Sequence, residues 1–329
     1  MARRVLATAS AFWHHGQAGE AALRAAGFEV SPSPRPGAYA ADELIPLLDG
    51  VDAVVAAVDA YTAAVFAACP QLKIVSRWGI GIDSIDLDAA TAAGVVVTNT
   101  PGTTTEAVAD YAFALLLASA RRVVEGEQAV RAGLWAELTG PLVCGKTLGL
   151  VGYGQIGRAV ARRAAGFGMT VLAYDPYQTA ADGAELVPLE RLLAESDFIS
   201  LHAAVTPETR GLIDARALAL VKPSAHLINT GRGALIDDAA LCAALHEGRL
   251  AGAALDVFSA EPLPADHPLR DAPRCLLTPH TAYNATEAAV DTSSMAADNI
   301  LRLAQGQPGA AVCNPEVLSA ANLRLRELP

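Results

Sequence analysis

The sequence has few aromatic residues and no surplus of positive charge. Aromatic side chains make up 5% of the 329 residues although 52% are hydrophobic, so Ala, Val and Leu supply most of the apolar surface. This balance favours helices packed on sheets over a sandwich with an aromatic core. With 24 Lys and Arg against 35 Asp and Glu, the net charge is −11. Binding to nucleic-acid phosphates needs clustered positive charge, so we expect no nucleic-acid partner.

Long apolar runs and paired cysteines are also scarce. The longest apolar run, 111–118, is far short of the roughly 20 residues that span a bilayer. The first 17 residues mix apolar and polar side chains, which argues against a signal peptide. The five cysteines include no CxxC pair, which argues against a disulfide framework and a zinc site. We therefore expect no membrane association, no metal and a cytoplasmic location.

Short runs rich in Val and Ile alternate with Ala-rich stretches along the whole chain. This alternation is typical of βαβ units that build a buried parallel sheet. The first half has four such runs, at 5–9, 51–55, 73–76 and 95–98. A second series has six, at 147–151, 170–174, 198–201, 225–229, 252–257 and 275–278. Six strands in one series are enough for a doubly wound domain.

Two long helical patterns, 105–121 and 286–304, bracket the second series. The chain is long enough for two domains of roughly 150 residues each. We infer that it leaves a first domain, builds a second and then returns to the first.

A glycine-rich turn opens the second series. Residues 148–151 run directly into GYGQIG at 152–157, and 158–168 reads as a helix. This pattern predicts a dinucleotide site: Gly152 permits the turn, Gly154 lets the backbone approach a pyrophosphate, and Gly157 lets helix and strand pack closely. Gln155 and Ile156 of the turn are also expected beside the cofactor, and the N-terminus of the helix that follows offers free amides to the phosphates. The alternative is a glycine-rich turn that binds no ligand.

The strand after this helix ends at Asp175. A carboxylate there can bind the ribose hydroxyls of NAD and would repel the additional phosphate of NADP. Residues 174–177 contain no Arg that could offset the repulsion. The sequence therefore predicts NAD as the cofactor.

Three polar residues follow later strands of the same series, where doubly wound sheets bind ligands. Arg232 lies in NTGRG, Glu261 in DVFSAEP and His280 in TPHTA. An Arg can hold a carboxylate with two hydrogen bonds, and a His beside a carboxylate can take the proton of a hydroxyl group. Taken alone, Arg232 would more often be a surface ion-pair partner, Glu261 a solvated loop charge and His280 a capping or packed histidine. Together they fit the oxidation of a 2-hydroxy acid.

At these residues the chain resembles the D-isomer-specific 2-hydroxyacid dehydrogenase family, in its phosphoglycerate-dehydrogenase-like branch. The similar stretches occur in the same order at 76–86, 99–110, 152–157, 229–237, 256–262 and 278–280. The resemblance implies a catalytic set of Arg232, Glu261 and His280. It also implies two Rossmann-like, doubly wound parallel-sheet domains of the α/β class and a homodimer paired through the helical segment after residue 104.

The resemblance also implies domain bounds and binding residues. We expect a discontinuous substrate domain at 1–103 and 285–329 and an NAD-binding domain at 104–284. Backbone amides of Gly79, Ile80 and Gly81 are expected to hold the substrate carboxylate. The other residues expected to contact substrate or nicotinamide are Arg77 and Tyr283. The further positions expected to line the cofactor are Thr206, Thr230, Gly231 and Asp256.

Departures from the family pattern bear on the substrate. Phosphoglycerate dehydrogenases usually have an Arg at the end of the strand that corresponds to 51–55. Here Asp59 follows that strand, and we expect it to repel a phosphate. The sequence therefore disfavours 3-phosphoglycerate and leaves the acid open.

The leading hypothesis is an NAD-dependent oxidoreductase that transfers a hydride between nicotinamide and C2 of a small D-2-hydroxy or 2-keto acid. One alternative keeps the scaffold but oxidises a small oxyanion such as phosphite, or reduces a phosphonate-bearing keto acid. Formate is disfavoured because formate enzymes of this family have Gln where Glu261 stands. Another alternative is an NAD-sensing, corepressor-like scaffold that binds proteins, which the intact catalytic set disfavours.

Overall fold

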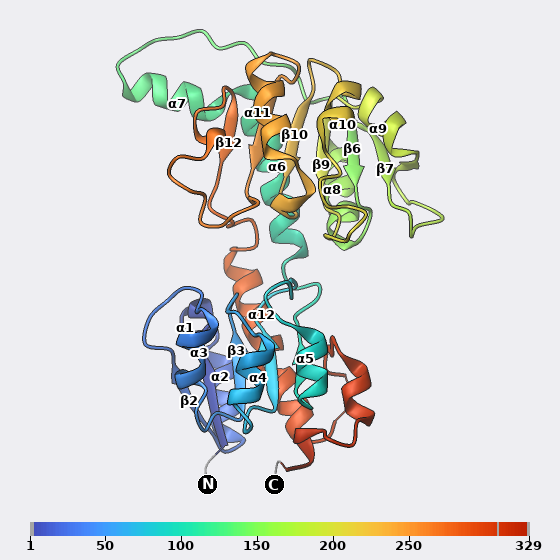
Figure 1. Cartoon of the computed structure of the whole chain (residues 1–329). Helices are drawn as coiled ribbons and strands as arrows, with labels where there is room; N and C mark the ends of the chain where they lie inside the picture. The colour runs from blue at the N-terminus through green and yellow to red at the C-terminus, as the bar shows by residue number, and fades with distance from the viewer. Residues whose placement is uncertain (1–2, 308, 328–329) are drawn as a thin grey trace. The chain divides into compact units, whose positions relative to one another are not determined.

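The computed structural model describes residues 3–307 and 309–327, which form two compact units. The first unit consists of Met1–Thr104 and Asn284–Pro329, and the second of Thr105–Tyr283. Each unit is built around a parallel sheet with helices beside it (Figure 1). The division lies within one residue of the bounds expected from the sequence.

The first unit has a five-stranded sheet in the order β2-β1-β3-β4-β5, in which every neighbouring pair is parallel. Its strands are β1 (Arg3–Ala7), β2 (Phe28–Pro32), β3 (Ala53–Ala56), β4 (Ile74–Arg77) and β5 (Val96–Thr98). Its helices are α1 (Ser10–His15), α2 (Gln17–Ala25), α3 (Ala41–Leu47), α4 (Ala63–Ala68), α5 (Leu87–Ala92) and α12 (Thr286–Ala304), with 3-10 helices at Pro315–Ser319 and Arg324–Glu327.

Hydrogen bonds attach α12 to β4, although more than 200 residues separate them in the chain. The indole of Trp78 donates to Ser293 at 2.9 Å, and the hydroxyl of Ser76 donates to the carbonyl of Ala296 at 2.9 Å. Both bonds are buried. The chain thus returns to the first unit after it has built the second.

The second unit has a seven-stranded parallel sheet in the order β12-β11-β10-β9-β6-β7-β8. Its strands are β6 (Thr147–Val151), β7 (Thr170–Tyr174), β8 (Glu185–Leu186), β9 (Phe198–Leu201), β10 (His226–Asn229), β11 (Gly252–Leu255) and β12 (Cys275–Leu277). Its helices are α6 (Thr105–Arg121), α7 (Val123–Arg131), α8 (Gln155–Gly166), α9 (Leu189–Glu195), α10 (Ala215–Leu220) and α11 (Asp238–His246), with 3-10 helices η1 (Gly233–Leu235) and η2 (Pro268–Arg270).

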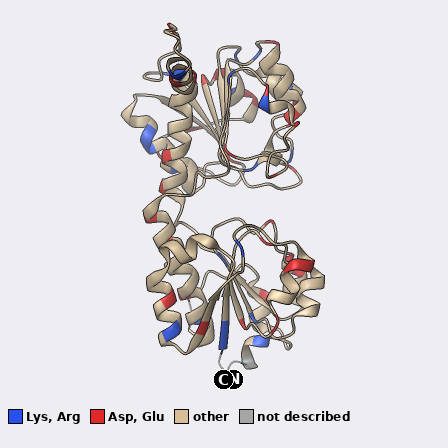
Figure 2. Ribbon diagram, turned by 90° about the vertical axis from the view of Figure 1, so that its left-hand side faces the viewer, with Lys and Arg blue, Asp and Glu red and all other residues tan. Residues whose placement is uncertain are grey.

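The central strands are buried on both faces, which explains why their sequences are continuous apolar runs rather than alternating ones. Figure 2 accordingly shows most charged residues on helices and loops and few on strands. The strand order reverses between β6 and β9, because β7 follows on one side of β6 and β9 lies on the other. Ligands bind doubly wound sheets beyond the carboxyl ends of the strands at such a reversal.

Sequence analysis did not find β2 or β8, and both are edge strands. In β2 only Phe28 and Val30 are buried, and the strand ends at Pro32, which an edge position tolerates because its nitrogen needs no partner. The strand β8 has only two residues. Short edge strands carry too few buried side chains to leave a clear apolar run in the sequence.

No helix in the part of the chain that the structure describes is long and apolar enough to cross a membrane.

Burial holds two histidines of the second sheet in their neutral form. His226, the first residue of β10, stacks on Phe198 with 5.5 Å between ring centroids and shares a 2.8 Å hydrogen bond with the hydroxyl of Ser119. Burial, together with the charge of Arg274, lowers the pKa of His226 to about 4. Burial likewise lowers the pKa of His202, which follows β9, to about 4.

We predict that the second unit loses stability as the pH falls from 6.5 to 4. In this range the unfolded chain binds a proton at each of these histidines that the folded chain does not. His226 alone accounts for about 3 kcal/mol of this loss. Urea unfolding at several pH values measures it. His226→Gln should make the pH dependence shallower, the exposed control His246→Gln should not, and equal slopes for all three proteins would contradict the prediction.

Candidate active site

The predicted polar residues of the second unit follow the carboxyl ends of its strands. Gly152 follows β6, Asp175 follows β7 and His280 lies just after β12. Because all seven strands are parallel, these ends lie at one edge of the sheet. Arg232 follows β10 at the same edge, where it precedes η1.

The centre of the site is a hydrogen-bonded pair of His280 and Glu261. The Nδ1 atom of His280 lies 2.6 Å from Oε2 of Glu261. The other carboxylate oxygen, Oε1, accepts the backbone amide of Phe258 at 2.9 Å. An ionised carboxylate requires the proton on Nδ1, so Nε2 of His280 is the nitrogen left for another partner.

The electrostatic surroundings favour the ionised form of Glu261. Partial burial by itself would raise the pKa of the carboxyl group. The hydrogen bonds from His280 and Phe258 and the positive charge of Arg232 act in the opposite direction, and they hold the pKa of Glu261 below its usual range. Arg232 therefore lies close enough to the pair to act on it electrostatically. The structure brings together all three residues that the sequence predicts as catalytic.

A buried carboxylate fixes the turn that presents His280. Asp256 is fully buried and accepts hydrogen bonds from the hydroxyl of Thr278 at 2.6 Å and from the amides of Thr281 at 3.1 Å and Ala282 at 2.8 Å. The amide of His280 donates to the carbonyl of Asp256 at 2.8 Å. His280 itself has a φ of 50°, a left-handed conformation that non-glycine residues rarely adopt. The family resemblance implies a place for Asp256 beside the cofactor, and in the structure its carboxylate binds this turn.

What a side chain would meet explains why each position of the GYGQIG turn that has a glycine needs one. Gly152 has a φ of 94°, and a Cβ there would lie 2.6 Å from the amide nitrogen of Ala203 beyond β9. A Cβ on Gly157 would lie 2.3 Å from the carbonyl oxygen of Gly152. A Cβ on Gly154 would meet no atom within 4 Å. The first and third glycines thus allow close backbone packing, and the second faces the open space that a phosphate group needs.

Two buried polar atoms near this turn have no partner among the described residues, Nδ1 of His202 and Oγ1 of Thr230. They follow the neighbouring strands β9 and β10, next to the reversal of the strand order. Buried polar atoms without partners are uncommon in folded proteins. With the open space at Gly154, they indicate a ligand at this edge, and the residues present fit a dinucleotide.

Asp175 lies in the half-buried position after β7, and protein amides bind both of its oxygens. Oδ2 accepts the amide of Tyr153 at 2.8 Å, and Oδ1 accepts the amide of Tyr177 at 2.9 Å. The sequence pattern does not predict a positive charge beside this connection, but Arg158 on α8 donates to the side chain of Gln178, three residues after Asp175, at 2.7 Å. Only the three-dimensional structure shows this proximity, because Arg158 is 20 residues from Gln178 in the chain.

The remaining predicted residues of the second unit lie around this edge. Thr206 donates from its hydroxyl to Glu208 at 2.7 Å in the loop after β9. Gln155, the first residue of α8, accepts a hydrogen bond from Thr105 at 3.3 Å. Tyr283 lies edge-on to His280 with 6.0 Å between ring centroids. The structure shows Tyr283 beside the histidine.

The loop of Gly79, Ile80 and Gly81 belongs to the first unit, where it follows β4. The amide of Gly79 donates to Thr100 Oγ1 at 2.9 Å, so it is already engaged within the protein. Arg77 donates from Nε to the carbonyl of Gly81 at 3.0 Å, and its guanidinium packs against Gly79. Arg77 therefore supports this loop from within the unit.

Asp59, which the sequence predicts to repel a substrate phosphate, lies inside the first unit. It is fully buried and accepts hydrogen bonds from the hydroxyl of Thr8 at 2.5 Å and the amide of Tyr39 at 3.1 Å. Burial raises the pKa of its carboxyl group, against these hydrogen bonds. Asp59 stabilises the end of β3, and its charge does not face solvent.

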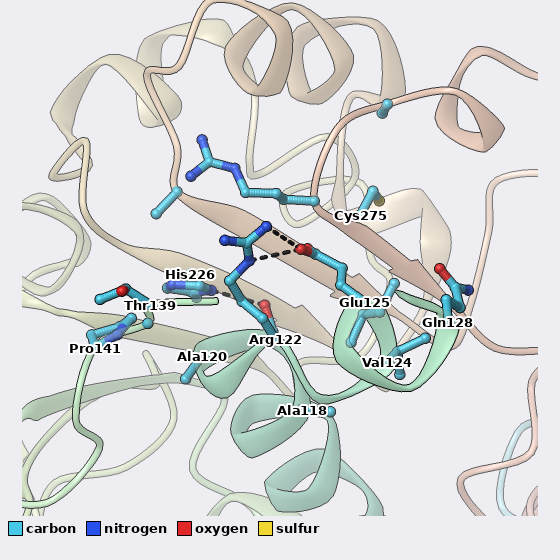
Figure 3. A pocket seen from close by; sticks show the side chains of 16 residues that line it. Ala118, Ala120, Arg122, Val124, Glu125, Gln128, Thr139, Pro141, His226 and Cys275 are labelled. Atoms are coloured by element: carbon cyan, nitrogen blue, oxygen red, sulfur yellow. Dashed lines mark hydrogen bonds and ion pairs between the residues drawn. The ribbon is translucent and has the colours of Figure 1, made fainter. Parts of the chain in front are cut away.

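A cavity of about 410 Å³ lies at the opposite edge of the second sheet, where β10 and β12 begin (Figure 3). Arg122 forms an ion pair with Glu125 there, and His226 is bonded to Ser119. These polar groups satisfy one another, and the predicted catalytic residues follow the other ends of the strands. The cavity is therefore separate from the candidate active site.

Among the described residues, no group of three or more His, Cys, Asp or Glu side chains is arranged to hold a metal ion.

Comparisons with known proteins agree with this geometry. The family model described as D-isomer specific 2-hydroxyacid dehydrogenase, NAD binding domain, matches residues 113–282. A glyoxylate reductase of Korarchaeum cryptofilum is 46% identical over 270 residues, which cover 79% of this chain and 81% of the relative. The chain belongs to the D-isomer specific 2-hydroxyacid dehydrogenase family.

Two further relatives extend this result. The D-3-phosphoglycerate dehydrogenase of Mycobacterium leprae is 46% identical over 232 residues, which cover 69% of this chain and 44% of the relative. The crystal structure of the TT0316 protein of Thermus thermophilus has a TM-score of 0.86 at 38% identity and covers 94% of this chain and 99% of that one. This 2-hydroxyacid dehydrogenase is thus an NAD-dependent enzyme with the fold of its relatives.

We predict that Asp175→Asn weakens NADH binding about tenfold or more, because the variant loses a charged acceptor for the ribose hydroxyls. It should also narrow the difference between NADH and NADPH, since the repulsion of the additional phosphate disappears. Fluorescence titration of both cofactors measures this. Asp182→Asn removes an equal charge from the same connection between β7 and β8 and should change neither Kd. Unchanged NADH binding by Asp175→Asn would contradict the role of Asp175.

Proposed function

We propose that this dehydrogenase interconverts a small 2-keto acid and the corresponding D-2-hydroxy acid, with His280 as the acid and base. The observation that supports this most is the 2.6 Å pair of His280 and Glu261 at the edge that carries the glycine turn. An imidazole held by a carboxylate is suited to move a proton to or from a substrate oxygen. Arg232, whose charge acts on the same pair, is suited to hold a carboxylate.

The roles of the three side chains follow from their chemistry. The nicotinamide, when bound, supplies the hydride to C2 in reduction and accepts it in oxidation. Nε2 of His280 donates a proton to the C2 oxygen during reduction and removes it during oxidation. Glu261 accepts a hydrogen bond from the Nδ1–H group and so keeps His280 in one orientation and tautomer. Arg232 binds the substrate carboxylate with two hydrogen bonds and draws electron density from the adjacent carbonyl group.

Glyoxylate, or a 2-keto acid of similar size, is the substrate we favour. The glyoxylate reductase of K. cryptofilum matches over about four fifths of both chains, whereas the phosphoglycerate dehydrogenase of M. leprae matches over less than half of its own length.

We also propose that the reaction takes place in the cytoplasm, because all five cysteines are free thiols.

We predict that His280→Ala lowers kcat for 2-keto acid reduction by about 10² to 10⁴-fold, the usual contribution of a general acid. Glu261→Gln should lower kcat less, since a neutral amide still orients the ring but stabilises its charged form poorly. NADH consumption at 340 nm measures both, and NADH binding by fluorescence should be unchanged in each variant. Full turnover by His280→Ala would contradict the proposal.

The same assay separates the alternatives. A panel of 2-keto acids is tested with NADH, and phosphite, formate and 3-phosphoglycerate are tested with NAD⁺. Turnover of phosphite alone would show the oxyanion reaction. Tight NADH binding without turnover of any compound in the panel would favour the NAD-sensing scaffold.

We further propose that the protein is a homodimer paired through α7 and the segment that follows it. In Figure 1 this part of the second unit reaches away from its sheet, and no residue of α7 is buried. Trp135 is 92% exposed. The exposed large apolar residues of the segment are Val123, Val124, Val130, Leu134, Trp135 and Leu142. Such a concentration of exposed large apolar side chains on one segment is typical of a protein–protein interface.

We predict that the double substitution Leu134→Glu and Trp135→Glu converts the dimer to a monomer, because it places two charges in an apolar interface. Light scattering after size-exclusion chromatography measures the mass. Leu220→Glu, at an exposed apolar position on α10, is the matched control and should remain dimeric. A parent protein that is already a monomer would contradict the proposal.

A further inference from the structure

Glu261 lies on an irregular loop that connects β11 to η2. No helix or strand runs through residues 258–267, so the backbone ladder of the sheet does not fix the carboxylate. Its distance from His280 nevertheless has to stay near 2.6 Å for the pair to form. Other contacts must therefore hold the loop in place.

A single carboxylate oxygen binds the loop on both sides of Glu261. Oδ2 of Asp238, the first residue of α11, accepts a hydrogen bond from the hydroxyl of Ser259, two residues before Glu261. The same Oδ2 lies 3.4 Å from Nε2 of His267, six residues after Glu261. The side chains of Asp238 and His267 are only 18% and 16% exposed, so water competes weakly for the contact between them. The hydrogen bond from Ser259 lies in an exposed position.

The orientation of His267 is itself fixed. Its Nδ1 accepts the amide of Leu269 at 3.3 Å, which caps η2, and Leu269 is fully buried. With Nδ1 acting as an acceptor, the ring carries a proton on Nε2, which faces Oδ2 of Asp238 at 3.4 Å. The second attachment of the loop is therefore continuous with the hydrophobic core.

Helix capping does not account for Asp238. The preceding residue, Asp237, is the N-cap of α11, and its carboxylate accepts the amide of Ala240 at 3.0 Å. The carboxylate of Asp238 turns instead to the loop. The first part of the loop also packs tightly, since a Cβ on Gly233 would lie 1.9 Å from the carbonyl carbon of Phe258.

We propose that Asp238 is a positioning residue for the reaction: it holds the loop at Ser259 and His267 so that Glu261 stays in contact with His280. This inference rests on the proposed function, in which His280, held by Glu261, transfers the proton. Asp238 touches neither substrate nor cofactor in this role.

Other charged and titratable groups also surround the pair and Asp238. Arg232 acts on Glu261 electrostatically, the backbone of Asp256 binds His280, and Tyr283 lies beside the His280 ring. Around Asp238, besides Ser259 and His267, are the thiols of Cys242 and Cys275. None of these contacts is removed by a substitution of Asp238 to Asn, which preserves the size of the side chain.

The test compares Asp238→Asn with Asp237→Asn in the full-length protein. Asn at position 238 is neutral and binds Ser259 and His267 less strongly, so the loop holds Glu261 less firmly. The protonated form of His280 is then less stabilised by Glu261. Reduction of a 2-keto acid needs this form, so the alkaline limb of the kcat/KM profile should move to lower pH. We expect kcat at pH 8 to fall about tenfold, the effect of one weakened charge-assisted hydrogen bond. NADH binding should stay unchanged.

Asp237→Asn keeps a good helix cap and should retain the parent profile. Asp238→Glu should restore part of the lost activity, since it keeps the charge. An alkaline limb of Asp238→Asn that coincides with that of the parent would overturn the inference, whether or not the melting temperature falls. If His280→Ala is inactive in that case, only the role of Asp238 fails. If His280→Ala is fully active, the proposed function itself fails.

Discussion

The parallel alignment of the seven strands in the second unit is the constraint on which the site depends. It places residues that are far apart in the chain, from Gly152 to His280, at the same edge of one sheet. Parallel strands require a crossover connection between neighbours, so each strand end leads into a loop of its own. One loop supplies the glycine turn, another the carboxylate of Asp175 and others the hydrogen-bonded pair of Glu261 and His280. The sheet fixes the positions, and the loops supply the chemistry.

The candidate site also requires that neighbouring backbone segments pack closely. The turn after β6 passes so near to β9 and α8 that side chains at Gly152 and Gly157 would collide with backbone atoms. The same holds where Gly233 meets Phe258. These glycines bring polar groups of neighbouring strand ends near one another.

Much of this organisation could be predicted from the sequence because it depends on local patterns. Apolar runs predicted the buried strands, and GYGQIG followed by Asp175 predicted a cofactor turn. Arg232, Glu261 and His280 could be predicted as candidates because each directly follows a strand or lies in the loop after it. Arg158, Asp238 and the buried state of Asp59 could not be predicted in this way. Their roles come from contacts with residues 20 or more positions away, such as Gln178, Ser259 and Thr8.

The left-handed backbone at His280 has a consequence for the proton transfer that we propose for this residue. Such a conformation costs about 1 kcal/mol or more, and the folded protein sustains it through the three hydrogen bonds to Asp256. That energy is supplied once, during folding, and not in each catalytic cycle. In the proposed mechanism the imidazole is thus preorganised: its orientation is already fixed when the substrate arrives, so little entropy would be lost at the moment of proton transfer.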